Sequence, residues 1–109
     1  MATTYKVLGQ SAPAATTAAD LYTVPAATEA IVSTITVANR GSSAGTYRVY
    51  VRPAGASVAN QHYVAYNVSL PATSTDTLTL GITLAATDVV SVFASTGDFS
   101  FNAFGTELA

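Results

Sequence analysis

The sequence contains no cysteine and no tryptophan, and only 9% of its 109 residues are charged. The absence of cysteine excludes disulfide bonds and metal sites built from thiolates, but it indicates no particular cellular compartment. The absence of tryptophan removes the ring that proteins use most often to stack against sugars. A chain of this length is expected to fold as one domain around one modest hydrophobic core.

The scarcity of charge limits the partners of the protein. An average soluble domain has roughly 25% charged residues, whereas here four cations and six carboxylates give a net charge of −2. The cations Lys6, Arg40, Arg48 and Arg52 are too few and too scattered to neutralise a nucleic-acid backbone, which excludes that partner. A surface with so little charge is expected either for an ordinary β-rich domain from a high-alanine proteome or for a domain whose surface is largely covered by other subunits.

Membrane segments are also missing from the sequence. Residues 1–10, MATTYKVLGQ, have no basic stretch followed by an apolar one, so we expect no signal peptide and synthesis in a cytoplasm. The stretch 21–40 is apolar enough to suggest a membrane span, but Pro25 and Glu29 interrupt it and residues 29–39 alternate with period two. This stretch is therefore predicted to be a strand, a turn and a second, longer strand.

Strand-like segments continue along the whole chain. Clusters of β-branched and aromatic residues favour strands, and the Gly, Pro, Asp and Asn residues between them favour turns. The predicted strands are Tyr5–Leu8, Leu21–Val24, Glu29–Asn39, Thr46–Arg52, Gln61–Ser69, Thr75–Leu80, Ile82–Leu84 after a bulge or corner at Gly81, Asp88–Ala94 and Phe99–Phe104. About eight strands with no significant helix predict an all-β protein, an antiparallel β-sandwich of the jelly-roll or immunoglobulin-like (Ig-like) kind.

Two local pairings and one strand face follow from the same pattern. Strands 29–39 and 46–52 are predicted to form an antiparallel hairpin, and residues 95–98 are predicted to be the turn of a second hairpin near the C-terminus. In the long strand, strict alternation places Ile31 and Ile35 on the same face.

Residues suited to catalysis are few. His62 is the single histidine, and because no Gly-x-Ser-x-Gly or comparable motif accompanies it, a hydrolase centred on it has little support. The six carboxylates stand near predicted strand ends and turns, where Asp bonds to local backbone, and no spacing pairs two of them. No calcium-loop or zinc-type spacing occurs. We expect no enzymatic activity, no catalytic residues, no cofactor and no metal site.

Tyrosines supply the candidate contact residues. Tyr47, Tyr50, Tyr63 and Tyr66 lie on two adjacent predicted strands. Alternation along the first of these strands places Tyr47 inward and Tyr50 outward, together with Arg48 and Arg52. Such tyrosines either pack across strands within the domain or present a ring to a protein or a sugar. Together with His62 they are the candidate interface or glycan-contact residues. The phenylalanines, Phe93, Phe99, Phe101 and Phe104, are expected in the core or at a subunit contact.

Several segments in order resemble a known group of proteins. These segments are YKVLGQ, LYTVPAATEAIVSTITVANR, RVYVRPAG, HYVAYNVSL, DTLTLGITLAATDVVSVFAS and FSFNAFG. They include a Tyr-Thr-Val-Pro opening followed by a strand and an Asn, and a Leu-x-x-Gly-Ile-x-Leu … Asp-x-Val-x-Val passage from Leu78 to Val92. In these features the chain resembles small β-sandwich structural proteins of tailed-bacteriophage virions, of the decoration or cement, collar or tail-fibre type.

The resemblance implies a non-enzymatic component of the virion, bound to the capsid or tail exterior as a symmetric homo-oligomer, with a trimer favoured. Its partners would be further copies of itself and other virion proteins, with no nucleic acid, membrane or cofactor. We expect residues 1–109 to form a single domain whose extended N-terminal segment, residues 1–20, takes part in assembly. The alternative is a carbohydrate-binding module that uses the surface tyrosines with Asn60, Gln61 and Asn67. The missing tryptophan favours the structural role.

Overall fold

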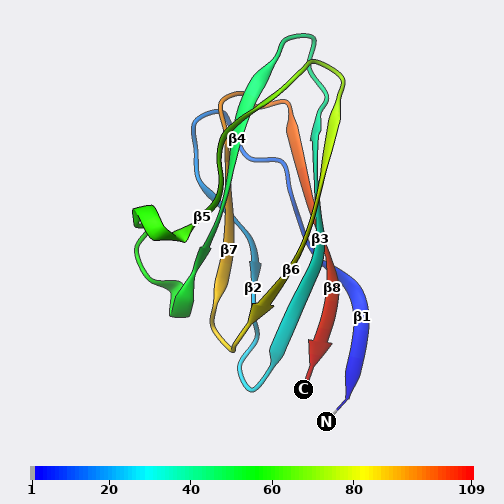
Figure 1. Cartoon of the computed structure of the whole chain (residues 1–109), viewed down its shortest axis with the longest axis vertical. Helices are drawn as coiled ribbons and strands as arrows, with labels where there is room; N and C mark the ends of the chain where they lie inside the picture. The colour runs from blue at the N-terminus through cyan, green and yellow to red at the C-terminus, as the bar shows by residue number, and fades with distance from the viewer. Residues whose placement is uncertain (1) are drawn as a thin grey trace.

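In the computed structural model, which describes residues 2–109, two antiparallel sheets of four strands pack face to face (Figure 1). Sheet A has the order β1 (Thr3–Ser11), β8 (Phe99–Leu108), β3 (Glu29–Asn39) and β6 (Thr75–Leu84). Sheet B has the order β2 (Ala19–Thr23), β7 (Val89–Ala94), β4 (Gly45–Arg52) and β5 (Tyr63–Leu70). Two short 3₁₀ turns, η1 (Pro53–Gly55) and η2 (Asn60–His62), lie between β4 and β5. The predicted all-β antiparallel sandwich is confirmed.

The strand pairing is nested around the middle of the chain. β4 pairs with β5, β3 with β6, β2 with β7 and β1 with β8, all antiparallel. The chain therefore runs as one long two-stranded ribbon, and the β3–β8 and β4–β7 pairs join the turns of this ribbon into two sheets. Of the two sandwiches that the sequence allowed, this is the strand order of the eight-stranded jelly roll.

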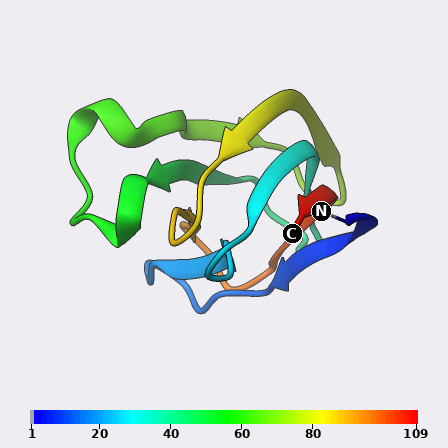
Figure 2. The same ribbon diagram turned by 90° about the horizontal axis from the view of Figure 1, so that it is seen from below.

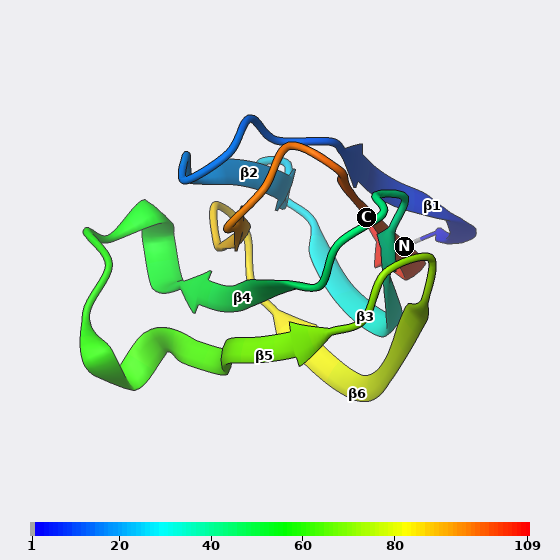
Figure 3. The ribbon, with the colours of Figure 1, turned by 90° about the horizontal axis from the view of Figure 1, so that it is seen from above.

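Both predicted hairpins are wrong, because β3 and β4 lie in different sheets, as do β7 and β8. The end of β3 provides a physical reason. The buried side chain of Asn39 donates from Nδ2 to the carbonyl oxygens of Ser43, Leu70 and Pro71, and its Oδ1 accepts the amide of Gly41. These bonds hold the chain in a bend that crosses from sheet A to sheet B at the end shown in Figure 3. The loops at this end connect the sheets instead of turning back within one.

β3 changes face at Ser33. Its register against both β6 and β8 shifts between Val32 and Thr34, and the extra residue turns the side chains that follow to the other face. Ile31 is therefore 40% exposed whereas Ile35 is fully buried, so the prediction that they share a face is wrong. On β6, Gly81 has φ of 65° and lies at the same register shift, which confirms the bulge predicted there.

The core between the sheets is mostly aliphatic and includes a cluster of three aromatic rings. Tyr47, Phe99 and Phe101 pack together with ring centroids 6.2 to 6.4 Å apart. The Tyr47 hydroxyl, from sheet B, donates to Oδ2 of Asp76 in sheet A at 2.9 Å. Burial, and then the Asp76 carboxylate, raises the pKa of Tyr47 well above its usual value. This bond ties the two sheets together on the side where β5 and β6 are the edge strands.

A second tyrosine–carboxylate bond ties the opposite side. Tyr22 of β2 donates its hydroxyl to Oε2 of Glu107 on β8, and Lys6 of β1 donates to Oε1 of the same carboxylate at 3.1 Å. Burial, together with the Glu107 carboxylate, raises the pKa of Tyr22, and the bonds from Tyr22 and Lys6 lower the pKa of Glu107. Each side of the sandwich therefore has one tyrosine–carboxylate hydrogen bond that joins the two sheets.

Residues 2–20 belong to the sandwich itself. β1 pairs along β8 and β2 begins at Ala19, so this segment, expected to serve assembly as an extended arm, contributes a strand to each sheet. Residue 1 lies outside the described residues. The amides of Ala2 and Ala109 each donate to the other's carbonyl oxygen, at 2.6 and 3.0 Å, and Figure 2 shows the two ends side by side. Neither 3₁₀ turn in residues 2–109 is long and apolar enough to cross a membrane.

Candidate functional site

Polar and aromatic side chains gather on the outer face of sheet B. Residues directly opposite one another in antiparallel strands share a face of the sheet. Asp20 of β2, Ser91 of β7, Tyr50 of β4 and Tyr63 of β5 stand opposite one another in one row across sheet B. Segment 53–62, which carries η1 and η2, projects from the side of the sandwich next to this row (Figures 2 and 3).

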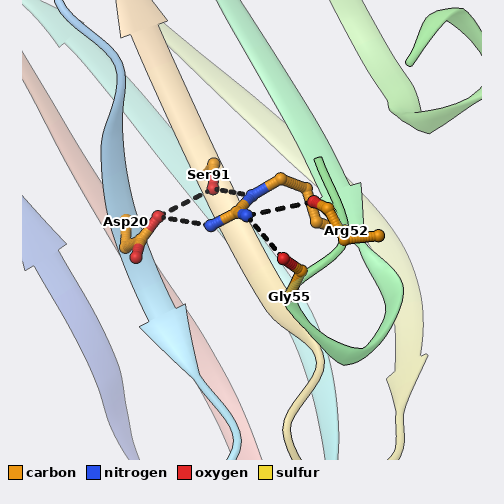
Figure 4. A network of polar contacts seen from close by, with 5 residues as sticks. Asp20, Arg52, Gly55 and Ser91 are labelled. Atoms are coloured by element: carbon orange, nitrogen blue, oxygen red, sulfur yellow. Dashed lines mark hydrogen bonds and ion pairs between the residues drawn. The ribbon is translucent and has the colours of Figure 1, made fainter. Parts of the chain in front are cut away.

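Arg52, the last residue of β4, is held by four acceptors (Figure 4). Its Nε donates to Oγ of Ser91 at 3.2 Å, and its Nη2 donates to Oδ1 of Asp20 at 3.0 Å. Its Nη1 donates to the carbonyl oxygens of Gly55 and Ala56, both at 3.0 Å. Ser91 in turn donates to Oδ1 of Asp20 at 3.0 Å. The guanidinium therefore joins β2, β7 and the segment after β4 into one network.

A hollow of about 340 Å³ opens beside this network. Its lining includes Asp20, Tyr50, Arg52 and Ser91 from the sheet and Val58 from segment 53–62. The ring of Tyr50 is buried, and this burial, followed by the charge of a neighbouring tyrosine, raises its pKa. The Asp20 side chain is 57% exposed, whereas that of Arg52 is 20% exposed. The hollow thus has a fixed polar wall and an accessible carboxylate at its rim.

A stacked row of rings continues from the hollow across sheet B. The ring centroids of Tyr50 and Tyr63 are 5.3 Å apart, and those of Tyr63 and Tyr66 are 4.8 Å apart in an edge-to-face arrangement. The guanidinium of Arg48 lies 4.6 Å from the centre of the Tyr66 ring and 4.5 Å from that of Phe93. Aromatic and cation–π contacts of this kind hold the row in place. We call these five residues the aromatic row.

Irregular pairing of β5 puts Tyr63 and Tyr66 on the same face, although residues three apart on a regular strand point to opposite faces. The register between β4 and β5 shifts twice along this stretch. Asn67 has φ of 50°, in the left-handed region that asparagine tolerates well, and its Oδ1 accepts Nε of Arg48 at 2.7 Å. The shift that separates Tyr63 from Tyr66 is the one between Val49 and Tyr50, where Val64 has no partner on β4, and it therefore creates part of the aromatic row.

The five residues singled out from the sequence fall in different places. Tyr47 is only 1% exposed and lies inward as expected, so its role as an interface or glycan contact is wrong: its ring fills the core. Tyr50, Tyr63 and Tyr66 come together in the aromatic row. His62 ends η2, where its Nδ1 accepts the amide of Ala59 at 3.1 Å. Among residues 2–109, no group of three or more His, Asp and Glu side chains is placed to hold a metal ion.

Several residues of the site were not singled out from the sequence. Arg48 and Arg52 alternate with Tyr50 along β4, and their outward position was predicted from that pattern, but neither was given a role in the site. Asp20 and Ser91 had no such signal, because only the pairing of β2 with β7 brings them to Arg52. Phe93, expected in the core or at a subunit contact, stacks on Arg48 instead.

The outer face of sheet A has a different chemistry. Tyr5 and Ile31 both stand opposite Thr106, and Val7 stands opposite Phe104. We call Tyr5, Val7, Ile31 and Phe104 the apolar patch; they are 82%, 48%, 40% and 37% exposed. Beside the patch, Thr34 and Thr36 of β3 face the β6 threonines in a threonine ladder, made of Thr34, Thr36, Thr77 and Thr79. The patch and the ladder contain no charged residue.

Comparisons of the chain with protein-family models, with curated proteins and with solved structures found no match. The class that the fold defines is a single jelly-roll sandwich with an apolar patch and a threonine ladder on one outer face and polar and aromatic side chains on the other.

Proposed function

We propose that the protein is a non-enzymatic structural component of a tailed-bacteriophage virion, bound to the capsid or tail exterior as a symmetric oligomer, with a homotrimer favoured. The observation that carries this proposal is the apolar patch of four exposed side chains on the outer face of sheet A, together with the threonine ladder beside it, neither of which contains a charged residue. The ordered segments that resemble virion structural proteins supply the biological setting.

Covering the face of sheet A is energetically favourable. The apolar patch gains roughly 25 cal/mol for each Å² that leaves water. Because the patch and the threonine ladder hold no charged side chain, a partner there desolvates no ion, which is the main cost at many interfaces. Centres of protein interfaces are depleted of charge in the same way. A large exposed patch on an isolated domain is a sign of such a contact.

A closed assembly also covers strand edges. β1 and β6 are the edges of sheet A, and the exposed backbone of an edge strand invites pairing with other chains. Closed symmetric assembly places the same face of every copy against a neighbour and leaves no such surface open. The trimer follows by analogy with phage decorations and fibres.

The mass of the purified protein in solution tests the oligomer. We expect native mass spectrometry to find a homo-oligomer, or a stable complex when capsid or tail particles are added. Phe104→Glu, which puts a charge into the apolar patch, should abolish that assembly. Val64→Glu is the matched control, because Val64 is similarly exposed at 44% but belongs to β5 of sheet B. Equal loss of assembly in both variants would contradict a contact through sheet A.

Purified virions provide the test of the proposed location on a phage particle. We expect the protein to be present in purified particles of the phage that encodes it, and electron microscopy of particles without it to lack a density on the capsid or tail exterior. A monomer at all concentrations, together with its absence from purified virions, would rule the proposal out.

A further inference from the structure

We propose that the hollow on the outer face of sheet B is a binding site for a neutral saccharide, whose next sugar units lie over Tyr63 and Tyr66. This site is on the opposite face from the apolar patch, so it does not depend on the structural role proposed above. The inference rests on the hydrogen-bonding capacity, the charge, the apolar walls and the size of the hollow.

The polar groups of the hollow are fixed before a ligand arrives. Arg52 is already bonded to four acceptors and Ser91 to Asp20, so neither has to lose much rotamer freedom on binding. Within residues 2–109, both bonds to the Asp20 carboxylate end on Oδ1, which leaves Oδ2 able to accept. The Tyr50 hydroxyl forms no hydrogen bond within the same residues and keeps contact with solvent. A carboxylate acceptor and a phenol that both donates and accepts suit the hydroxyl groups of a sugar.

The charge of the hollow favours a neutral ligand. Arg52 and Asp20 form an ion pair at 3.0 Å, so their charges largely cancel within the site. A phosphate or carboxylate would meet the exposed Asp20, and four of the five guanidinium N–H donors that would otherwise bind it are engaged. A cation would lie close to Arg52. A polyhydroxylated ligand without charge avoids both penalties.

The apolar walls and the size of the hollow also suit a neutral saccharide. Val58, 48% exposed, and the edge of the buried Tyr50 ring give surfaces for the C–H faces of a sugar ring. A volume of about 340 Å³ lies at the small end of the range for ligand sites, roughly 300–1,000 Å³. Further rings would therefore extend out of the hollow. Tyr63 borders Tyr50 and Tyr66 borders Tyr63, so the aromatic row offers a track for them.

Titration of the full-length protein with saccharides, followed by two-dimensional NMR, tests the site. The probes are glucose, galactose, mannose and N-acetylglucosamine, their oligomers of up to about four units, and inorganic phosphate. We expect at least one neutral saccharide to shift the amides of residues 18–20, 50–58 and 91, longer oligomers to bind more tightly, and phosphate to shift none of them.

Two substitutions make the result specific. Tyr50→Phe keeps the buried ring and removes only the hydroxyl, so affinity should fall roughly three- to tenfold, as for the loss of one hydrogen bond. Tyr66→Ala should weaken binding of oligomers and leave monosaccharide binding unchanged. Thr77→Lys on sheet A, the control, should change neither.

The proposal is overturned if no saccharide in the panel shifts the residues of the hollow, if Tyr50→Phe binds as tightly as the wild type, or if phosphate binds there. None of these outcomes bears on assembly, because the mass measurement and the Phe104→Glu variant report on sheet A alone.

Discussion

The outer faces of sheets A and B are built on similar four-stranded frames and have opposite chemistry. The outer face of sheet A exposes the apolar patch and the threonine ladder to solvent. The polar side-chain groups of the ladder are hydroxyls, which carry no charge. Sheet B holds Arg48 and Arg52, two of the four cations. Arg48 donates from Nε to Asn67, and Arg52 donates to Ser91, Asp20 and two backbone carbonyls.

The comparison separates two ways in which a low-charge domain can use its surface. On sheet B, polar groups bond to one another within the chain, so the side chains around the hollow are held in place before any ligand binds. On sheet A, little is organised by the chain itself, and a partner that covers the face gains apolar burial at little electrostatic cost. We therefore assign assembly to sheet A and saccharide binding to sheet B, as proposals that the following changes would test.

The largest expected effect comes from breaking the core that both faces share. Ile35→Asp places a charge where the wild-type side chain is fully buried, which costs several kcal/mol against a total stability of roughly 5–15 kcal/mol. We expect no cooperative thermal unfolding by circular dichroism. Thr77→Asp, an equal charge on the exposed face of sheet A, is the control and should melt normally. Cooperative melting of Ile35→Asp would place this residue on the outer face instead.

A smaller loss is expected when the network on sheet B is cut. Arg52→Ala leaves Asp20, Ser91 and two carbonyl oxygens without their donor, and should cost about 1–3 kcal/mol. Because the partners stay near water, we expect the lower part of that range. Hydrogen exchange should accelerate in segment 53–62 and stay unchanged in sheet A. Arg52→Lys should not restore protection, because one ammonium cannot reproduce the fork of a guanidinium. Equal acceleration in both sheets would show that the network is not local.

The hydrogen bond from Tyr47 to Asp76, which joins the two sheets, is expected to contribute to stability in a pH-dependent way. The pKa of Tyr47 is raised in the folded state, so the stability that its protonated form provides is complete below the unfolded pKa of about 10 and is lost as the pH rises above it. Tyr47→Phe should lower stability by about 1 kcal/mol at pH 7 and should reduce the loss of stability between about pH 9 and 12. Urea denaturation at several pH values measures both effects. Tyr5→Phe, at an 82% exposed position, should match the wild type, and a Tyr47→Phe profile that also matches would refute the role of this bond.

The smallest effect on folding is expected on the outer face of sheet A. Thr77→Lys should change stability by no more than about 0.5 kcal/mol, since Thr77 is exposed. It should nevertheless prevent assembly, because a neighbour on this face would have to desolvate the ammonium. Native mass spectrometry and a thermal melt of the same sample separate the two results. Ser69→Lys on sheet B is the control, and normal assembly of Thr77→Lys would move the contact away from the threonine ladder.

The positions of the strands were largely readable from the sequence, and their partners were not. Glu29–Asn39 was predicted with the bounds that the structure has, because period-two alternation and β-branched residues are local properties. The hairpin of 29–39 with 46–52 failed because the crossing between sheets depends on Asn39 bonding to Leu70 and Pro71, which are distant in the chain. The prediction that Ile31 and Ile35 share a face failed because a bulge inverts every side chain that follows it, and the place of the bulge is set by the neighbouring strands.

By itself, the sequence determined an all-β sandwich, the inward position of Tyr47, the outward position of Arg48 and Arg52 and the bulge at Gly81. These follow from side-chain periodicity and backbone preference within a few residues. Only the tertiary structure decided the jelly-roll order, the meeting of Asp20 and Ser91 with Arg52, and the contrast between the two outer faces. The physical reason is that strand register joins residues far apart in the chain, and no local pattern encodes which strand lies beside which.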